Sequence, residues 1–191
     1  NFLNNSLSSS VSYSKTFPGE PQVNISLSAT HSQNTNPQAI NMTLPTFQGS
    51  ISRIYPFAPK GGSKRGAIQN INFQYNVRGE NRILTTDSLF FKKEMFESAK
   101  SGFQHSIPIS TNFKLFKHFS FSSSTNFQET WVFKTIDKEF DFENQTLITN
   151  ENKGFDSFRT YNLSTSLGTT VYGMYTFSEK SKLKQLRHVI R

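Results

Sequence analysis

Residues 31–60 read HSQNTNPQAINMTLPTFQGSISRIYPFAPK and hold the pattern that decides the fold. A polar turn comes first, then a long run of extended character, then an aromatic and proline-rich end. Ile40, Met42 and Leu44 alternate with polar residues, which is the period of a strand with one apolar face. The phase of this alternation changes at Pro45. Because proline has no amide hydrogen to donate, Pro45 is expected to mark a bulge or an unpaired edge position.

The same plan of a long alternating strand followed by a turn repeats along the whole chain. Apolar and aromatic residues take one set of alternate positions, and Ser, Thr, Asn and Gln take the other. The expected strands cover residues 1–16, 23–30, 40–57, 71–78, 107–115, 119–133 and 159–177, and a further strand begins after residue 182. Two long loops are expected at about 80–102 and 134–158. In the first, Phe91, Met95 and Ala99 have the spacing of a short amphipathic helix.

Composition and strand length favour a membrane protein over a soluble sheet. Only 34% of the residues are hydrophobic, yet 20 are Phe, which fits a chain with one apolar surface and one surface in contact with water. The expected strands exceed the ~5–6 residues usual in soluble sheets and reach the ~9–11 residues that cross a bilayer. The predicted fold is therefore all-β: a fragment of about seven to eight strands from a larger antiparallel transmembrane β-barrel.

The connections and the chain ends refine this prediction. The longest connections follow the fourth and sixth strands, as extracellular loops do in outer-membrane barrels, and most of the others are short or basic. This places the His31 end of the third strand outside the cell and its YPFAPK end toward the periplasm. Residues 1–191 are expected to belong to one barrel domain that is truncated at both ends, because the pattern begins and stops in the middle of a strand.

The sequence pattern is also compatible with several other functions. A porin, a receptor-type transporter or a small closed barrel would share the same pattern, and a soluble β-sandwich binding module is a further alternative. A barrel hydrolase would need a Ser/His pair, but the neighbours His105 and Ser106 point to opposite faces of a strand. The chain has no cysteine, and its four histidines lack the spacing of metal ligands. No enzymatic activity, cofactor or metal site is predicted.

Charge is unevenly placed along the chain, whose formal net charge is +8. Asp137, Glu139, Asp141 and Glu143 alternate in the second long loop, where they form either a solvated loop or a divalent-cation site. The cations at Lys60, Lys64, Arg65, Lys114, Lys117 and 180–191 are expected at the periplasmic end. Since they fall in turns instead of gathering on one face, nucleic acid is not an expected partner.

Several strings resemble the barrel of LptD/OstA-type lipopolysaccharide-assembly proteins. They are HSQNT (31–35), NMTLPTF (41–47), SRIYPFAPK (52–60), NINFQYNVRGENR (70–82), TTDSLFFKKEMF (85–96), QHSIPIST (104–111), ETWVFKT (129–135) and QLRHVIR (185–191). The resemblance covers most of the chain.

The resemblance implies a translocon in the outer membrane of a Gram-negative bacterium, which inserts lipopolysaccharide into the outer leaflet. It further implies a lipoprotein plug of the LptE type as partner, and a connection to the periplasmic Lpt bridge through a jelly-roll domain that is not in this sequence. The family moves lipid without covalent chemistry, so no catalytic residue is carried over.

Candidate site residues follow from such a transport path. A polar lumen for the sugar could be lined by Asn72, Gln74, Asn76, Arg78, Ser110, Asn112 and Lys114. The acyl chains would need a lateral exit through a weakly paired seam. Pro45 and Pro108 each remove a donor from the ladder and are candidates for weak pairing, although a simple bulge explains each of them as well.

Overall fold

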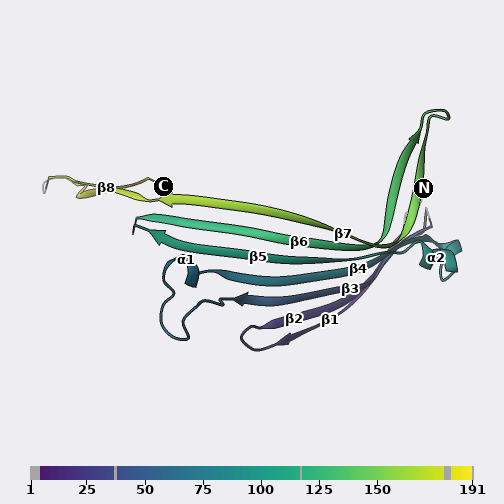
Figure 1. The fold of residues 1–191 in the computed structure, drawn as a ribbon, viewed down its shortest axis with the longest axis horizontal. Coiled ribbons are helices and arrows are strands. Elements are labelled where there is room, and N and C mark those ends of the chain that lie inside the picture. The colour runs from purple at the N-terminus through teal and green to yellow at the C-terminus, as the bar shows by residue number, and fades with distance from the viewer. Residues whose placement is uncertain (1–4, 37, 117, 179–181, 191) are drawn as a thin grey trace. The chain divides into compact units, whose positions relative to one another are not determined.

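The structure is a computed structural model that describes residues 5–36, 38–116, 118–178 and 182–190 (Figure 1). Seven strands form one sheet in chain order: β1 (Ser6–Phe17), β2 (Val23–Asn34), β3 (Ala39–Ile54), β4 (Asn72–Thr86), β5 (Lys100–Leu115), β6 (Phe119–Asp141) and β7 (Thr146–Thr169). A separate antiparallel pair follows, β8 (Val171–Thr176) and β9 (Gln185–Ile190). The short helices are α1 (Gly66–Gln69), η1 (Asp87–Leu89) and α2 (Lys93–Glu97).

The prediction of an all-β, antiparallel protein is confirmed. Within the described residues the seven-stranded sheet is open, with β1 and β7 as its edges, so the larger barrel of which the chain was predicted to be a fragment is not confirmed. The chain divides into two compact units, Asn1–Ile54 with Gln74–Ile107 and Phe127–Tyr161, and Tyr55–Phe73 with Pro108–Asn126 and Asn162–Arg191. None of the described helices is long and apolar enough to cross a membrane.

A β-bulge at Pro45 sets the faces of β3. Thr43 lies opposite Thr30 and Thr46 lies opposite Ser28, so both Leu44 and Pro45 face the single residue Ala29. The extra residue compensates for the change of phase seen in the sequence, because a one-residue slip would otherwise turn every later side chain to the wrong face. Ile40 and Met42 therefore share a face with Phe47 and Ile51, and the bulge that the sequence predicts is confirmed.

Asn81 of β4 holds the bulge in place. Its side-chain amide donates a hydrogen bond to the carbonyl oxygen of Leu44 at 2.8 Å. The hydroxyl of Ser101 on β5 in turn donates to the Asn81 side-chain oxygen, also at 2.8 Å. The bulged carbonyl is thus the end of a chain of hydrogen bonds that crosses the three neighbouring strands β3, β4 and β5.

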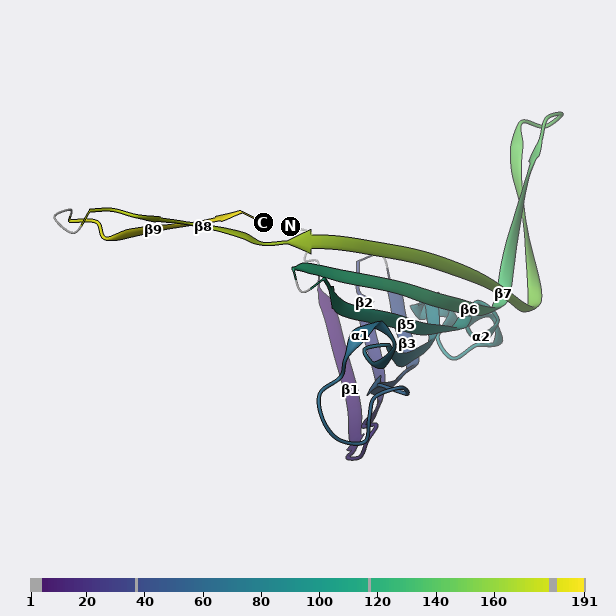
Figure 2. The same cartoon turned by 60° about the vertical axis from the view of Figure 1, so that its left-hand side comes forward.

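The two expected long loops are corrected by the structure. β4 continues to Thr86 and β5 begins at Lys100, so the first connection is 87–99, shorter than the predicted 80–102. The second segment, 134–158, is almost entirely an extension of β6 and β7, which run side by side to a short turn at 142–145 (Figure 2). Where both faces of a strand are polar, the alternation of apolar and polar residues disappears from the sequence. Both segments were therefore expected to be loops.

The small buried core of the described residues lies where the connection 87–99 packs against β3 and β4. Met95 of α2 is 2% exposed and packs with Ile40, Met42 and Ile83. The predicted helix is therefore present, although it spans only 93–97, and Ala99 packs against the cluster as expected. Phe91 is the exception, since it has a positive φ and its side chain is 73% exposed.

The apolar face of the strands is largely uncovered. Tyr13 on β1 and Leu163 on β7 are 66% and 75% exposed, and many other large apolar side chains are open to the surroundings. Exposure on this scale is unusual for a soluble monomer and is expected where strands contact lipid.

Candidate functional site

A continuous polar face runs across the strands of the first compact unit, opposite the apolar one. One hollow of about 310 Å³ is lined by Ser8, Ser10, Thr30, Ser32, Asn41 and Thr43. A second of about 370 Å³ is lined by polar side chains of β1 to β5, including Thr16, Asn24, Gln48, Asn76 and Gln104. Directly opposed residues in antiparallel strands share a face, so these side chains lie together as the alternation predicts.

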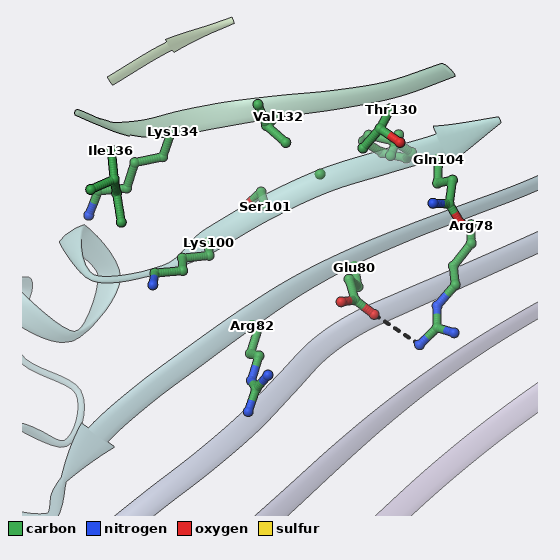
Figure 3. A pocket seen from close by; sticks show the side chains of 12 residues that line it. Arg78, Glu80, Arg82, Lys100, Ser101, Gln104, Thr130, Val132, Lys134 and Ile136 are labelled. Atoms are coloured by element: carbon green, nitrogen blue, oxygen red, sulfur yellow. Dashed lines mark hydrogen bonds and ion pairs between the residues drawn. The ribbon is translucent and has the colours of Figure 1, made fainter. Parts of the chain in front are cut away.

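A third hollow on this face, of about 600 Å³, gathers four cationic side chains (Figure 3). Three neighbouring strands supply its cations: Arg78 and Arg82 from β4, Lys100 from β5 and Lys134 from β6. Glu80 is the single acid in its lining. We call this hollow the cationic groove. It lies toward the ends of the strands that are joined by the 87–99 connection.

The cations of the groove differ in their partners. Arg78 forms an ion pair with Glu80 at 3.0 Å. Lys134, whose side chain is 8% exposed, pairs with Glu151 of β7 and also donates to the carbonyl oxygen of Glu97. In the part of the chain that the structure describes, neither Arg82 nor Lys100 has an ion pair with an acid. The groove therefore keeps a net positive charge.

The residues predicted to line a lumen fall into two groups. Gln74, Asn76 and Arg78 lie in the first unit, where Gln74 donates to Asn76 at 3.0 Å and Arg78 reaches the groove. The rest lie in the second unit. Asn72 and Ser110 bind one another there, because Asn72 donates to the Ser110 carbonyl oxygen and the Ser110 hydroxyl donates to the Asn72 oxygen.

The other predicted positions are placed as follows. Asn112 and Lys114 are exposed on β5. Pro108 lies inside the same strand, and Pro45 forms the bulge described above. Of the cations expected at the periplasmic end, the Lys64 ammonium lies over the ring of Tyr55, 2.9 Å from its centroid. Lys117, Lys180 and Arg191 lie outside the described residues.

Sequence reasoning missed most of the groove. Glu80 and Arg82 fell in an expected loop, as did Lys100 and Lys134, so nothing brought them to Arg78. The sequence did contain a sign that this strand continues, because Arg78, Glu80 and Arg82 keep the two-residue period of β4 beyond the last apolar position of the predicted strand.

His105 and Ser106 lie on different faces, as predicted. The Tyr75 hydroxyl is 2.7 Å from His105 Nδ1, and the His105 ring lies 4.3 Å from that of Trp131. Ser106 instead lines the second polar hollow with Asn76 and Gln48. The geometry therefore does not place the two side chains together as a nucleophile and base would require.

The acidic run at the tip of β6 is bound up in the turn. Asp141 accepts hydrogen bonds from the backbone of Glu143 and from both the backbone and the side chain of Asn144, and these lower its pKa. Asp137 accepts from the side chain of Asn152 across the hairpin. Among the described residues no three acidic, histidine or cysteine side chains gather as a metal site would need.

The ion pair at Glu151 predicts a pH-dependent hairpin. The hydrogen bond from Lys134 lowers the pKa of Glu151 below its usual 4.5. A lowered carboxyl pKa stabilises the folded state above the unfolded value, and this contribution is lost as the pH falls through the lowered pKa. The protection of the β6 and β7 amides, which is their hydrogen-exchange rate relative to that of an unfolded chain at the same pH, should therefore fall below pH 4.5.

The matched variant for this prediction is Glu151→Gln, which should exchange faster at neutral pH and lose that part of the pH dependence. Asp141→Asn serves as a control, since Asp141 also has a lowered pKa but sits in the turn. An unchanged pH profile in Glu151→Gln would contradict the assignment.

Comparison with known proteins gives one match. The family described as LptD protein matches residues 1–191, which is the entire chain. No curated protein and no solved structure matches it.

Proposed function

The chain belongs to the family of LptD proteins, and from this premise we propose that it forms part of an outer-membrane β-barrel that inserts lipopolysaccharide into the outer leaflet. The family itself acts in lipopolysaccharide assembly at the outer membrane of Gram-negative bacteria, and it is not a family of enzymes.

The observation that carries the proposal is the separation of the two faces. One face presents polar side chains from β1 to β5 and the cationic groove, while the other exposes large apolar side chains. In a closed barrel the first would line a wet interior for the sugar and the second would contact lipid. Strands beyond residues 1–191 would complete the closure.

The lateral exit for the acyl chains is the second part of the proposal. The bulge at Pro45 leaves an extra residue between β2 and β3, and Pro108 removes a donor within β5. Either position would lower the cost of separating two strands. A lipoprotein of the LptE type inside the barrel, and a jelly-roll domain joined to the periplasmic Lpt bridge, would complete the translocon.

Site-specific crosslinking tests the path. Photo-crosslinking side chains placed at Arg78 and at Asn112 should trap lipopolysaccharide in living cells, because each occupies a polar position in the alternation of its own strand. Phe73 and Phe113 are the matched controls, one on each of the same two strands, at apolar positions of the alternation. Labelling confined to Phe73 and Phe113 would overturn the proposed lumen.

A further inference from the structure

We propose that the cationic groove binds the phosphate groups of a glycolipid headgroup. The inference rests on the proposed function, because it assigns a ligand chemistry to one part of the polar face. It adds a specific subsite that includes three cations, Arg82, Lys100 and Lys134, from outside the predicted lumen.

The fold gathers positive charge in the groove. Residues from three separate parts of the sequence converge here: Arg78 and Arg82 on β4, Lys100 on β5 and Lys134 on β6 (Figure 3). Like charges this close repel one another, and Glu80 and Glu151 offset only two of the four cations. A bound anion would relieve the repulsion.

The four cations of the groove differ in whether an acid of the chain already binds them. Arg78 is engaged by Glu80, and Lys134 is engaged by Glu151 and the Glu97 carbonyl. Among the described residues neither Arg82 nor Lys100 forms an ion pair. The two acids that line the neighbouring hollow with them, Glu97 and Glu151, are paired with Lys93 and Lys134. A guanidinium and an ammonium facing one hollow are the groups that proteins use to bind phosphate.

The size and lining of the groove suit a lipid headgroup better than a free phosphate ion. The hollow is about 600 Å³, far larger than one phosphate ion and within the range of ligand sites. Gln104 and Thr130 line it and supply hydrogen-bonding groups suited to sugar hydroxyls, while Val132 and Ile136 give it an apolar wall. Cations, hydrogen-bonding groups and apolar surface together suit an amphiphile with a phosphorylated sugar.

The test is binding to the full-length protein in detergent micelles. The probes are a diphosphorylated glucosamine-disaccharide lipid, the same lipid without phosphates, and inorganic phosphate. The double variant Arg82→Gln with Lys100→Gln should weaken binding of the phosphorylated lipid by roughly tenfold or more, as expected for lost charge-assisted hydrogen bonds. It should leave the affinity for the dephosphorylated lipid within about twofold, because no charged bond is lost there.

Two further variants make the result specific. Lys92→Gln with Lys138→Gln removes the same charge from exposed positions outside the groove and should bind like the unaltered protein. Arg82→Lys with Lys100→Arg keeps the charge and should restore most of the affinity. Heat-modified mobility on gels confirms that every variant is folded before binding is measured.

Three outcomes would overturn the proposal: unchanged affinity of the folded Gln variant, an equal loss for both lipids, or displacement of the lipid by equimolar inorganic phosphate, which would identify a free-anion site. Failure here is distinct from failure of the transport path. If crosslinks at Arg78 and Asn112 persist without any preference for phosphate, the path stands and only the subsite falls.

Discussion

Deleting Asn76 from β4 is expected to prevent stable assembly, whereas deleting Pro45 from β3 is expected to leave it intact. Both changes shorten a strand by one residue in its middle. Their effects should differ because β3 contains a spare residue at that point and β4 has a regular alternation there.

The cost of deleting Asn76 follows from the period of a strand. Residues on one side of the deletion must turn to the other face, so either Phe73 and Tyr75 enter the polar face or Arg78 and Glu80 enter the apolar one. Moving an aromatic side chain from an apolar to a polar setting costs about 1.5–3 kcal/mol. A charged residue on a lipid-facing surface costs up to about 2–4 kcal/mol.

Deleting Pro45 has the opposite consequence. Leu44 would then lie alone opposite Ala29, with Thr43 still opposite Thr30 and Thr46 still opposite Ser28. The alternation from Ile40 onward becomes regular, and every side chain keeps its face. The measurement is the fraction of protein that reaches the heat-modifiable folded form, together with its urea unfolding curve. Equal loss in both deletions would contradict the assigned register.

The Pro45 deletion also tests the lateral exit. A folded variant that no longer delivers lipopolysaccharide to the cell surface would support a role of the bulge in opening the β2–β3 seam. Normal delivery would remove Pro45 from the proposal and leave Pro108 as the remaining candidate.

Alternation in the sequence was enough to predict the strands and their two faces, because each residue's face depends only on its position along its own strand. The change of phase at Pro45 predicted the bulge for the same reason. What alternation could not show was where a strand ends when both faces become polar, as in the β6–β7 hairpin around Asp137 and Asn152.

The cationic groove shows a different limit. Arg78, Lys100 and Lys134 are far apart in sequence, and only the pairing of β4, β5 and β6 brings them to one hollow. Pairing register between strands is a property of two segments together, which a single strand's pattern does not contain. The core around Met95 likewise depends on where the 87–99 connection folds back.

Replacing Gly79 with Ala is expected to destabilise the sheet by about 1–3 kcal/mol, the usual range for overpacking a tight site. Gly79 is buried on β4, and the ring of Phe103 on β5 lies directly across it. A Cβ atom at Gly79 would be 2.4 Å and 2.6 Å from two ring carbons, closer than atoms can approach. The ring must therefore move away from its contact with Phe133, 6.3 Å between centroids.

A double-mutant cycle with Phe103→Ala isolates this contact. Since the clash involves the ring alone, Gly79→Ala should cost little in a Phe103→Ala background, with a coupling of about 1 kcal/mol or more. Gly102→Ala should not be rescued in the same way, because its Cβ would meet the Trp131 carbonyl oxygen at 2.9 Å. Gly154→Ala, with nothing within 4 Å of its Cβ, is the neutral control. Additive effects of Gly79→Ala and Phe103→Ala on the free energy of unfolding would show that the ring does not lie over the glycine.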